Sequence, residues 1–195
     1  MNRDEVLRHF RETGALLEGH FLLSSGLHSP VYMQCAKVLM HPRRAELLCQ
    51  ALAHRIVAKM GADAFDLAVS PAMGGVVVGY ELARQLGIPS IFTERVEGIF
   101  QLRRGFDVPK GARLIMVEDV VTTGKSSREC IDCAEAAGGK VVAAACLIDR
   151  TDGEVDLGRP FFALAGYKVP AYSPDALPPE LAQIPAVKPG SRGLK

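Results

Sequence analysis

The chain has 195 residues, 48% of them hydrophobic and 23% charged, a composition typical of a folded globular domain rather than a disordered or fibrous protein. A chain of this length can bury a full core without metal ions or disulfides. Its formal net charge of +1 and the absence of a long basic run exclude the electrostatic pattern of a general nucleic-acid-binding protein. No apolar run in it reaches the roughly 18 residues that indicate a membrane span.

The cysteines and the first residues indicate a cellular compartment. The chain has five cysteines, and its start, MNRDEVLRHF, is charged where a secretory signal would be apolar. We therefore expect a cytoplasmic protein with reduced thiols. Cys130 and Cys133 form a C-x-x-C pattern within a predicted helix, with no second pair and no following histidine pair. This context favours buried structural thiols over a redox or zinc site.

The first 61 residues predict two helices separated by short strands. Asn2 can cap a first helix that ends near Gly14. Residues 19–35, GHFLLSSGLHSPVYMQC, alternate aromatic and aliphatic residues with turn residues, which predicts short strands around a turn. Pro42 then begins a second helix with apolar residues spaced by four, and Gly61 ends it.

From residue 66 onward, short aliphatic strands alternate with helices, which predicts a parallel sheet with crossover helices. Ligands of such sheets gather at the carboxyl ends of the strands. Two glycine-bearing turns, at Gly74-Gly75 and at Gly124, fall at such ends. The predicted strands are 66–70, 89–93, 112–119 and 141–149, and the predicted helices are 76–87 and 128–139.

The last part of the chain has a different composition. Residues 169–195 contain six of the twelve prolines and few periodic apolar residues. We expect an extended tail that lies over the surface of its own subunit or of a partner subunit.

The segment LIMVEDVVTTGKSS, residues 114–127, carries the clearest functional pattern. Its end matches the G-K-[ST] of a P-loop, but the first glycine of that motif would fall at Asp119, whose charge opposes phosphate. A ribose 5-phosphate fits better, because the threonines and the helix start can bind the phosphate while Glu118 and Asp119 accept from ribose hydroxyls. Adjacent side chains on a strand alternate, so we expect the strand to end between the two acids. The alternative is an acidic strand end with an ordinary helix cap.

VEDVVTTGKSS resembles the phosphoribosyl-diphosphate (PRPP) signature of type I phosphoribosyltransferases. Together with GHFLLSSGLHSPVY, PAMGG and CLIDR, it resembles the orotate phosphoribosyltransferases from about Leu17 to Arg150. The resemblance implies an α/β fold with a five-stranded parallel sheet flanked by helices and a small N-terminal hood. It also implies a homodimer with shared active sites, and Mg²⁺-dependent transfer of ribose 5-phosphate from PRPP to orotate. The products are orotidine 5-phosphate and diphosphate, in pyrimidine biosynthesis.

By this resemblance the chain is a single domain, with the hood at about 1–40, a core at about 41–168 and the tail at 169–195. Glu118 and Asp119 contact the ribose, the latter as a catalytic residue, and Mg²⁺ is held mainly through PRPP. The segment around the 5-phosphate comprises Val120, Val121, Thr122, Thr123, Gly124, Lys125 and Ser126. The diphosphate loop comprises Ala72, Met73, Gly74 and Gly75, for which simple helix entry is the alternative.

The same resemblance assigns the orotate contacts to Ser25, Gly26, Thr122 and Arg150. An arginine fork at a strand end suits the carboxylate of orotate, because it binds such a group bidentately. A salt bridge from Arg150 to Asp149 or Asp152 is the alternative.

The chain also departs from the family's usual pattern. Ser24 and Met73 stand where lysines are common, and the loop TERVEGIFQLRRGFD, residues 93–107, lacks the usual lysine and histidine. We therefore expect arginines to neutralise the diphosphate, with Arg95 in a catalytic role beside Arg103 and Arg104. Lys125 stands where a small residue is common, and either pairs with the 5-phosphate or is an ordinary surface lysine.

Two alternative functions keep PRPP as ligand. The first is transfer to a purine, which has no carboxylate for Arg150. The second is a PRPP-binding regulator that has lost catalysis, consistent with the missing lysines. Regulators of this kind usually carry a nucleic-acid surface, which the charge balance does not favour. We expect no nucleic-acid partner and no membrane association.

Overall fold

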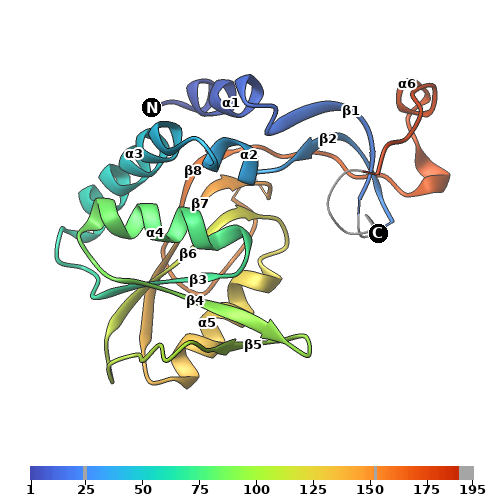
Figure 1. Ribbon diagram of the computed structural model, residues 1–195. Helices are drawn as coiled ribbons and strands as arrows, with labels where there is room; N and C mark the ends of the chain where they lie inside the picture. The colour runs from blue at the N-terminus through green and yellow to red at the C-terminus, as the bar shows by residue number, and fades with distance from the viewer. Residues whose placement is uncertain (24–25, 152, 189–195) are drawn as a thin grey trace.

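A six-stranded sheet forms the centre of the protein, in a computed structural model that describes residues 1–23, 26–151 and 153–188 (Figure 1). The strand order is β5-β4-β3-β6-β7-β8, and all neighbours are parallel except β4 and β5. The predicted five parallel strands are therefore confirmed. The strands are β3 (Leu67–Pro71), β4 (Ser90–Val96), β5 (Ile99–Leu102), β6 (Arg113–Val121), β7 (Lys140–Asp149) and β8 (Phe161–Gly166).

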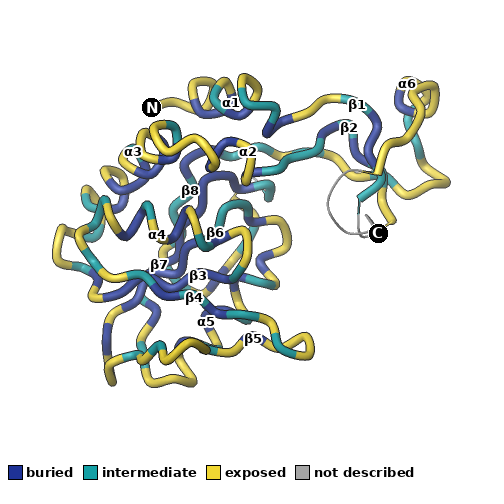
Figure 2. Tube along the Cα trace, viewed as in Figure 1, coloured by how far each residue is buried: buried dark blue, intermediate teal, exposed yellow. Residues whose placement is uncertain are grey.

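Helices cover both faces of this sheet, because its strands are apolar on both sides. In β6, Ile115 and Val117 belong to a core shared with α1 (Arg3–Glu12), α3 (Pro42–Met60) and α4 (Gly74–Leu86). The alternating residues Leu114 and Met116 belong to a second core, shared with α5 (Lys125–Ala136). Figure 2 shows the central strands buried and the outer helix faces exposed.

The start and stop signals predicted for the first two long helices are confirmed. Asn2 caps α1 in a capping box, in which its side chain accepts from the Glu5 N–H and Glu5 accepts from the Asn2 N–H. Pro42 begins α3, and Gly61 ends it with a positive φ of 91°. A short helix, α2 (Ala36–Leu39), precedes α3.

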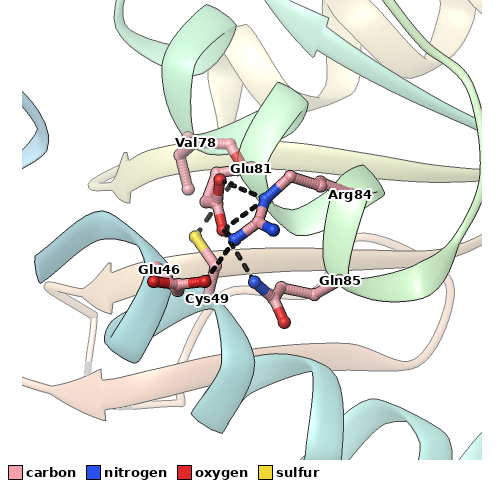
Figure 3. A network of polar contacts seen from close by, with 6 residues as sticks. All are labelled: Glu46, Cys49, Val78, Glu81, Arg84 and Gln85. Atoms are coloured by element: carbon pink, nitrogen blue, oxygen red, sulfur yellow. Dashed lines mark hydrogen bonds and ion pairs between the residues drawn. The ribbon is translucent and has the colours of Figure 1, made fainter. Parts of the chain in front are cut away.

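A polar network joins α3 to α4 (Figure 3). The Arg84 guanidinium donates to Glu81 on its own helix and to Glu46 on α3, at 2.8 and 2.7 Å from Nη2. On the side of α4 that packs on the sheet, Gly79 lies so close to β3 that an added Cβ would be 1.9 Å from Ser70 Oγ. Together these contacts fix α4, and with it the glycine turn at which α4 begins.

A separate antiparallel hairpin, β1 (Leu16–Leu22) and β2 (His28–Met33), projects from the main sheet (Figure 1). The last described part of the chain lies against it and contains a 3-10 turn (Pro174–Ala176) and α6 (Pro179–Ala182). The predicted tail does lie over its own subunit, where it pairs with both hairpin strands, but this turn and α6 mean that it is not extended throughout. The predicted division into hood, core and tail stays a prediction.

The segment that follows β4 also differs from the expectation of a loop at 93–107. Arg95 and Val96 still belong to β4, and residues 99–102 form β5, which pairs antiparallel with β4. Glu97, at a φ of 51°, and Gly98 make the turn of this hairpin. Of the helices that the structure describes, none has the length and apolarity needed to cross a membrane.

Candidate active site

The predicted phosphate turn lies at the carboxyl end of β6. The strand ends at Val121, Thr122 and Thr123 are exposed, and α5 begins at Lys125, three residues earlier than predicted. Gly124 makes the turn with a φ of 72°, and an added Cβ would lie 2.7 Å from the Val155 side chain. The first turn of a helix presents backbone N–H groups without helical partners, so this end can bind an anion.

Glu118 and Asp119 point to opposite faces of the sheet. The prediction that the strand ends between them is wrong, because Val120 and Val121 continue the pairing with β7. Glu118 accepts a hydrogen bond from α5, whereas the Asp119 carboxylate lies against the start of α4. A ligand that contacts both carboxylates must therefore lie over the carboxyl end of β6, between the N-termini of α4 and α5.

Ser127 is a site residue that the sequence analysis missed. Its hydroxyl is fully buried and donates to the Glu118 carboxylate. Burial raises the pKa of Glu118 to about 7, the Ser127 hydrogen bond opposes this shift, and the Asp119 charge adds to it. A polar residue at the third position of α5, one turn beyond Gly124, was the only available signal for this contact.

The predicted diphosphate loop lies directly beside Asp119. An added Cβ on Gly74 would be 2.8 Å from Asp119 Oδ1, so only glycine allows this approach. The Asp119 carboxylate also accepts from the Val120 N–H at 2.9 Å, and burial raises its pKa above the ordinary value. The Ala72-Met73 peptide is cis, and the Ala72 N–H donates to the Thr93 carbonyl at 2.8 Å. The loop and the acidic pair, predicted separately, are thus adjacent.

Arg150 lies in a cavity of about 530 Å³ at the same edge of the sheet. Thr122 and Thr123 of the phosphate turn line it together with Arg150, as do four apolar residues: Leu23, Leu27, Val169 and Ala171. The Arg150 Nε atom is buried and has no hydrogen-bond partner within the described parts of the chain. Burial lowers the pKa of this guanidinium, so an anionic ligand would compensate a real desolvation cost.

The predicted salt bridge partners of Arg150 were Asp149 and Asp152. The Asp149 carboxylate instead accepts from Thr151 and from the Gly153 N–H, at 2.7 to 2.8 Å. Asp152 lies outside the described residues. Of the other predicted orotate contacts, Ser25 also lies outside them, and Gly26 is exposed beside the cavity-lining Leu27, with a φ of 83°.

Comparison with known proteins gives the family. A family model described as "Phosphoribosyl transferase domain" matches residues 38–161. The orotate phosphoribosyltransferase of Caulobacter vibrioides is 58% identical over 195 residues, which is 100% of both chains. That of Maricaulis maris is 57% identical over 194 residues, with 100% of each chain covered. The chain belongs to the orotate phosphoribosyltransferase family.

Solved structures agree with this assignment. The orotate phosphoribosyltransferase of Aeropyrum pernix superimposes with a TM-score of 0.69 at 27% identity, over 83% of this chain and 93% of that one. An adenine phosphoribosyltransferase from Thermoanaerobacter pseudethanolicus superimposes with a TM-score of 0.59 at 20% identity, over 70% of this chain and 88% of that one. The latter likeness concerns the fold alone.

The arginines expected to replace the lysines common in orotate phosphoribosyltransferases are all paired within the chain. Arg95 donates to Glu129 on α5 and to the Gly98 carbonyl, and its guanidinium lies 4.0 Å from the centre of the Phe100 ring. Arg104 donates to both oxygens of Glu94, and Arg103 is 4.0 Å from the same carboxylate. The structure thus pairs Arg95 with Glu129, and Arg103 and Arg104 with Glu94, and their role at the diphosphate stays a prediction.

Lys125 lies on the exposed side of α5. Its side chain is 80% exposed, and Nζ is 3.9 Å from Glu129 on the next helical turn. The same carboxylate therefore faces both Arg95 and Lys125.

The C-x-x-C pattern lies in α5, as predicted. All five cysteines are free, and Cys130 is buried, with its pKa raised to about 12 by burial. Such a thiol is a poor nucleophile and a poor metal ligand. Within the described ranges, no group of three or more His, Cys, Asp or Glu side chains is placed to hold a metal ion.

Proposed function

We propose that this protein transfers ribose 5-phosphate from PRPP to orotate, giving orotidine 5-phosphate and diphosphate in pyrimidine (UMP) biosynthesis in the cytoplasm. The observation that carries this proposal is the buried, unpartnered Nε of Arg150 in a cavity that shares Thr122 and Thr123 with the phosphate turn. Orotate is a flat ring with a carboxylate. A guanidinium fork beside an apolar wall matches both of these features.

In this proposal the edge of the sheet holds PRPP at three places. The turn from Val120 to Ser126 and the start of α5 bind the 5-phosphate through backbone N–H groups and hydroxyls. Glu118 and Asp119 accept from the ribose hydroxyls, and each accepts more strongly when it is ionised. The loop from Ala72 to Gly75 binds the diphosphate, because its glycines allow backbone N–H groups to approach the anion closely.

The chemistry then depends mainly on positioning. The bond from the ribose carbon to diphosphate breaks as the orotate ring nitrogen bonds to that carbon. Diphosphate leaves with the electron pair and takes up the proton that the ring nitrogen releases. Holding orotate at Arg150 and the ribose at Glu118 brings the two reacting atoms together, which supplies much of the rate enhancement. Positive charge and N–H groups at the leaving diphosphate supply the rest.

The residues present fit a magnesium ion carried by the substrate. Mg²⁺ is usually held by one or two carboxylates together with substrate phosphates and water rather than by an all-protein cage. Asp119 is one such carboxylate beside the glycine loop, and Glu118 is a second one on the opposite face of β6, beside the start of α5. When bound, the ion supplies charge neutralisation for the departing diphosphate.

We also propose a homodimer with shared active sites. Val77 and Tyr80 lie on one face of α4, in line with Met73 of the diphosphate loop, and the side chains of Met73, Val77 and Tyr80 are 81%, 49% and 65% exposed. An apolar face of this kind on a folded domain supports a protein partner. In a dimer formed through this face, Arg95 on the β4-β5 hairpin of one subunit would lie near the glycine loop of the other subunit.

This sharing of sites has its own test. Arg95→Ala and Asp119→Asn homodimers are each expected to lose turnover. Mixing them is expected to restore part of it, because one hybrid site then has both residues intact. Unimpaired turnover by Arg95→Ala would remove Arg95 from the mechanism.

An absorbance assay tests the activity. Orotate absorbance is expected to fall on adding PRPP and Mg²⁺, with no product from adenine, hypoxanthine or uracil under the same conditions. Turnover of a purine in place of orotate would establish the first alternative function. Binding of PRPP without turnover of any base would establish the regulator.

A further inference from the structure

Of the described hairpin residues, those beside the tip reach the orotate cavity. Leu23 and Leu27 line the cavity, and the Leu23 N–H donates to the Leu27 carbonyl at 2.8 Å. These two residues directly follow β1 and directly precede β2. Whatever holds the ends of the two strands therefore sets the position of this cavity wall.

Both strand ends are held by one distant segment, residues 169–188, which we call the C-terminal clamp. On the β2 side, His28 and Tyr172 exchange two backbone hydrogen bonds of 2.8 Å. On the β1 side, the Val187 N–H donates to the His20 carbonyl at 2.8 Å, and the Leu22 N–H donates to the Val187 carbonyl at 2.9 Å. The clamp is thus hydrogen-bonded to the hairpin on both sides of its tip.

Side chains of the hairpin add further contacts with the clamp. The His20 ring is buried, and its Nδ1 lies 2.7 Å from the Ile184 carbonyl, which fixes that nitrogen as a donor. Its Nε2 lies 2.5 Å from Nδ1 of His28 on the opposite strand. The buried Ser29 hydroxyl lies 2.9 Å from the Val31 carbonyl on its own strand and 3.3 Å from the Pro170 carbonyl of the clamp, and its single proton favours the shorter contact. One ring therefore connects the clamp to both strands.

The clamp also contributes directly to the cavity. Val169 and Ala171, at its start, line the cavity together with Arg150. The backbone hydrogen bonds of Tyr172 come one residue later. The same segment therefore forms one wall of the cavity and holds the hairpin tip that forms another.

We propose that the C-terminal clamp is a positioning element for the base-binding pocket, and that it acts on the hairpin tip through His20 and the backbone of Val187. The inference rests on the proposed function, since the pocket is taken to bind orotate. If the clamp acts on this pocket, it should affect the binding of the base and not the binding of PRPP. The PRPP groups are assigned to β6, α4 and α5, which the clamp does not contact through any of these hydrogen bonds.

The test removes one clamp contact in the full-length protein. Val187→Pro lacks the N–H that donates to His20, whereas the matched control Val187→Ala keeps it, and the Val187 side chain is 56% exposed. A lost hydrogen bond of about 1 kcal/mol corresponds to about fivefold. We expect Val187→Pro to raise the KM for orotate by about that factor, with kcat and PRPP affinity within twofold of wild type. Val187→Ala should stay within twofold in all three quantities.

A second pair of variants tests His20. His20→Asn can keep a donor at the place of Nδ1, toward Ile184, and is expected to retain more orotate affinity than His20→Gln, whose amide reaches the place of Nε2 instead. Hydrogen exchange provides a readout without substrate, in which the amides of Leu22 and His28 should exchange faster in Val187→Pro than in Val187→Ala.

The outcomes separate the two proposals. Absence of orotate turnover by the wild-type protein would refute the proposed function. Wild-type turnover together with an unchanged orotate KM in Val187→Pro would refute the clamp. Equal losses of orotate and PRPP binding, or unfolding of Val187→Pro, would refute it as well, because the segment would then be merely structural.

Discussion

The carboxyl edge of the sheet and the hairpin with its clamp differ in how their polar groups are satisfied. At the edge, Glu118 and Asp119 are buried with raised pKa values, and the Arg150 Nε has no partner among the described residues. In the hairpin, by contrast, His20 and Ser29 are buried with partners, the Ile184 carbonyl for His20 and the Val31 carbonyl for Ser29. Buried polar groups without full compensation cost stability, so they persist where a ligand completes them.

The largest effect is expected on replacing Arg150, whose buried Nε has no partner among the described residues. Arg150→Leu should lower kcat/KM for orotate by about 10²–10³-fold, because a desolvated charge pair with the ligand is lost. PRPP affinity should remain near wild type, measured by calorimetry. Arg150→Lys keeps the charge without the bidentate fork and should fall between the two. Normal orotate turnover by Arg150→Leu would place the base elsewhere.

The next effect concerns the turn at Gly124. An alanine there must adopt a φ of 72° and place its Cβ 2.7 Å from Val155, so Gly124→Ala should lose about 2–4 kcal/mol of unfolding free energy and bind PRPP more weakly. Gly87 is a matched control, with a φ of 70° and open space around an added Cβ. Gly87→Ala should lose only the backbone part, about 1–2 kcal/mol, and keep PRPP affinity. Equal effects in both variants would mean that the contacts around Gly124 are unimportant.

A third prediction uses the pKa of Glu118. Because burial raises the folded-state pKa from 4.5 to about 7, the folded protein binds more protons than the unfolded chain between these values, and stability falls as pH rises through this window. Glu118→Gln should therefore be more stable than wild type at pH 8 by about 1–3 kcal/mol, while losing turnover. The difference should vanish below about pH 4.5, measured by denaturant unfolding.

The exposed Glu97 supplies a control for that experiment. Glu97 lies on the turn between β4 and β5, and Glu97→Gln should change the free energy of unfolding at pH 8 by less than about 0.5 kcal/mol. If Glu118→Gln were less stable than wild type at pH 8, the ionised Glu118 would stabilise the fold. The carboxyl edge of the sheet would then not differ from the hairpin in this respect.

The smallest effect is expected at Lys125. Its 80% exposure and its 3.9 Å separation from Glu129 predict a change below about 0.5 kcal/mol in stability for Lys125→Ala. The KM for PRPP decides between the two roles left open for this lysine. A rise of severalfold would indicate pairing with the 5-phosphate, and no change would indicate an ordinary surface lysine.

The sequence predicted the edge well because its signals are local. A strand, a glycine turn and a helix follow one another within residues 113–136, and periodicity places each of them. The errors there have local causes. Two valines after Asp119 extend the strand by pairing with β7, and the left-handed Gly124 starts α5 early. Ser127 was missed because its partner Glu118 becomes a neighbour only once the helix has packed on the sheet.

The hairpin and clamp were harder to predict because their contacts are distant in sequence. His20 and Ile184 are 164 positions apart, and a proline-rich segment offers no periodicity from which their contact follows. The pairing is made by backbone groups, which every residue except proline shares, so side-chain patterns do not reveal it. Similarly, β5 is a strand of four residues within a charged loop and lacks a clear alternation.

The most direct test of the account is a calorimetric titration of magnesium-loaded PRPP into the full-length protein. The account predicts saturable binding of one PRPP per chain, which weakens at least tenfold in Gly124→Ala but stays unchanged in Arg150→Leu. Failure of the wild-type protein to bind PRPP, or equal binding by Gly124→Ala, would contradict the assignment of the sugar phosphate to this edge of the sheet.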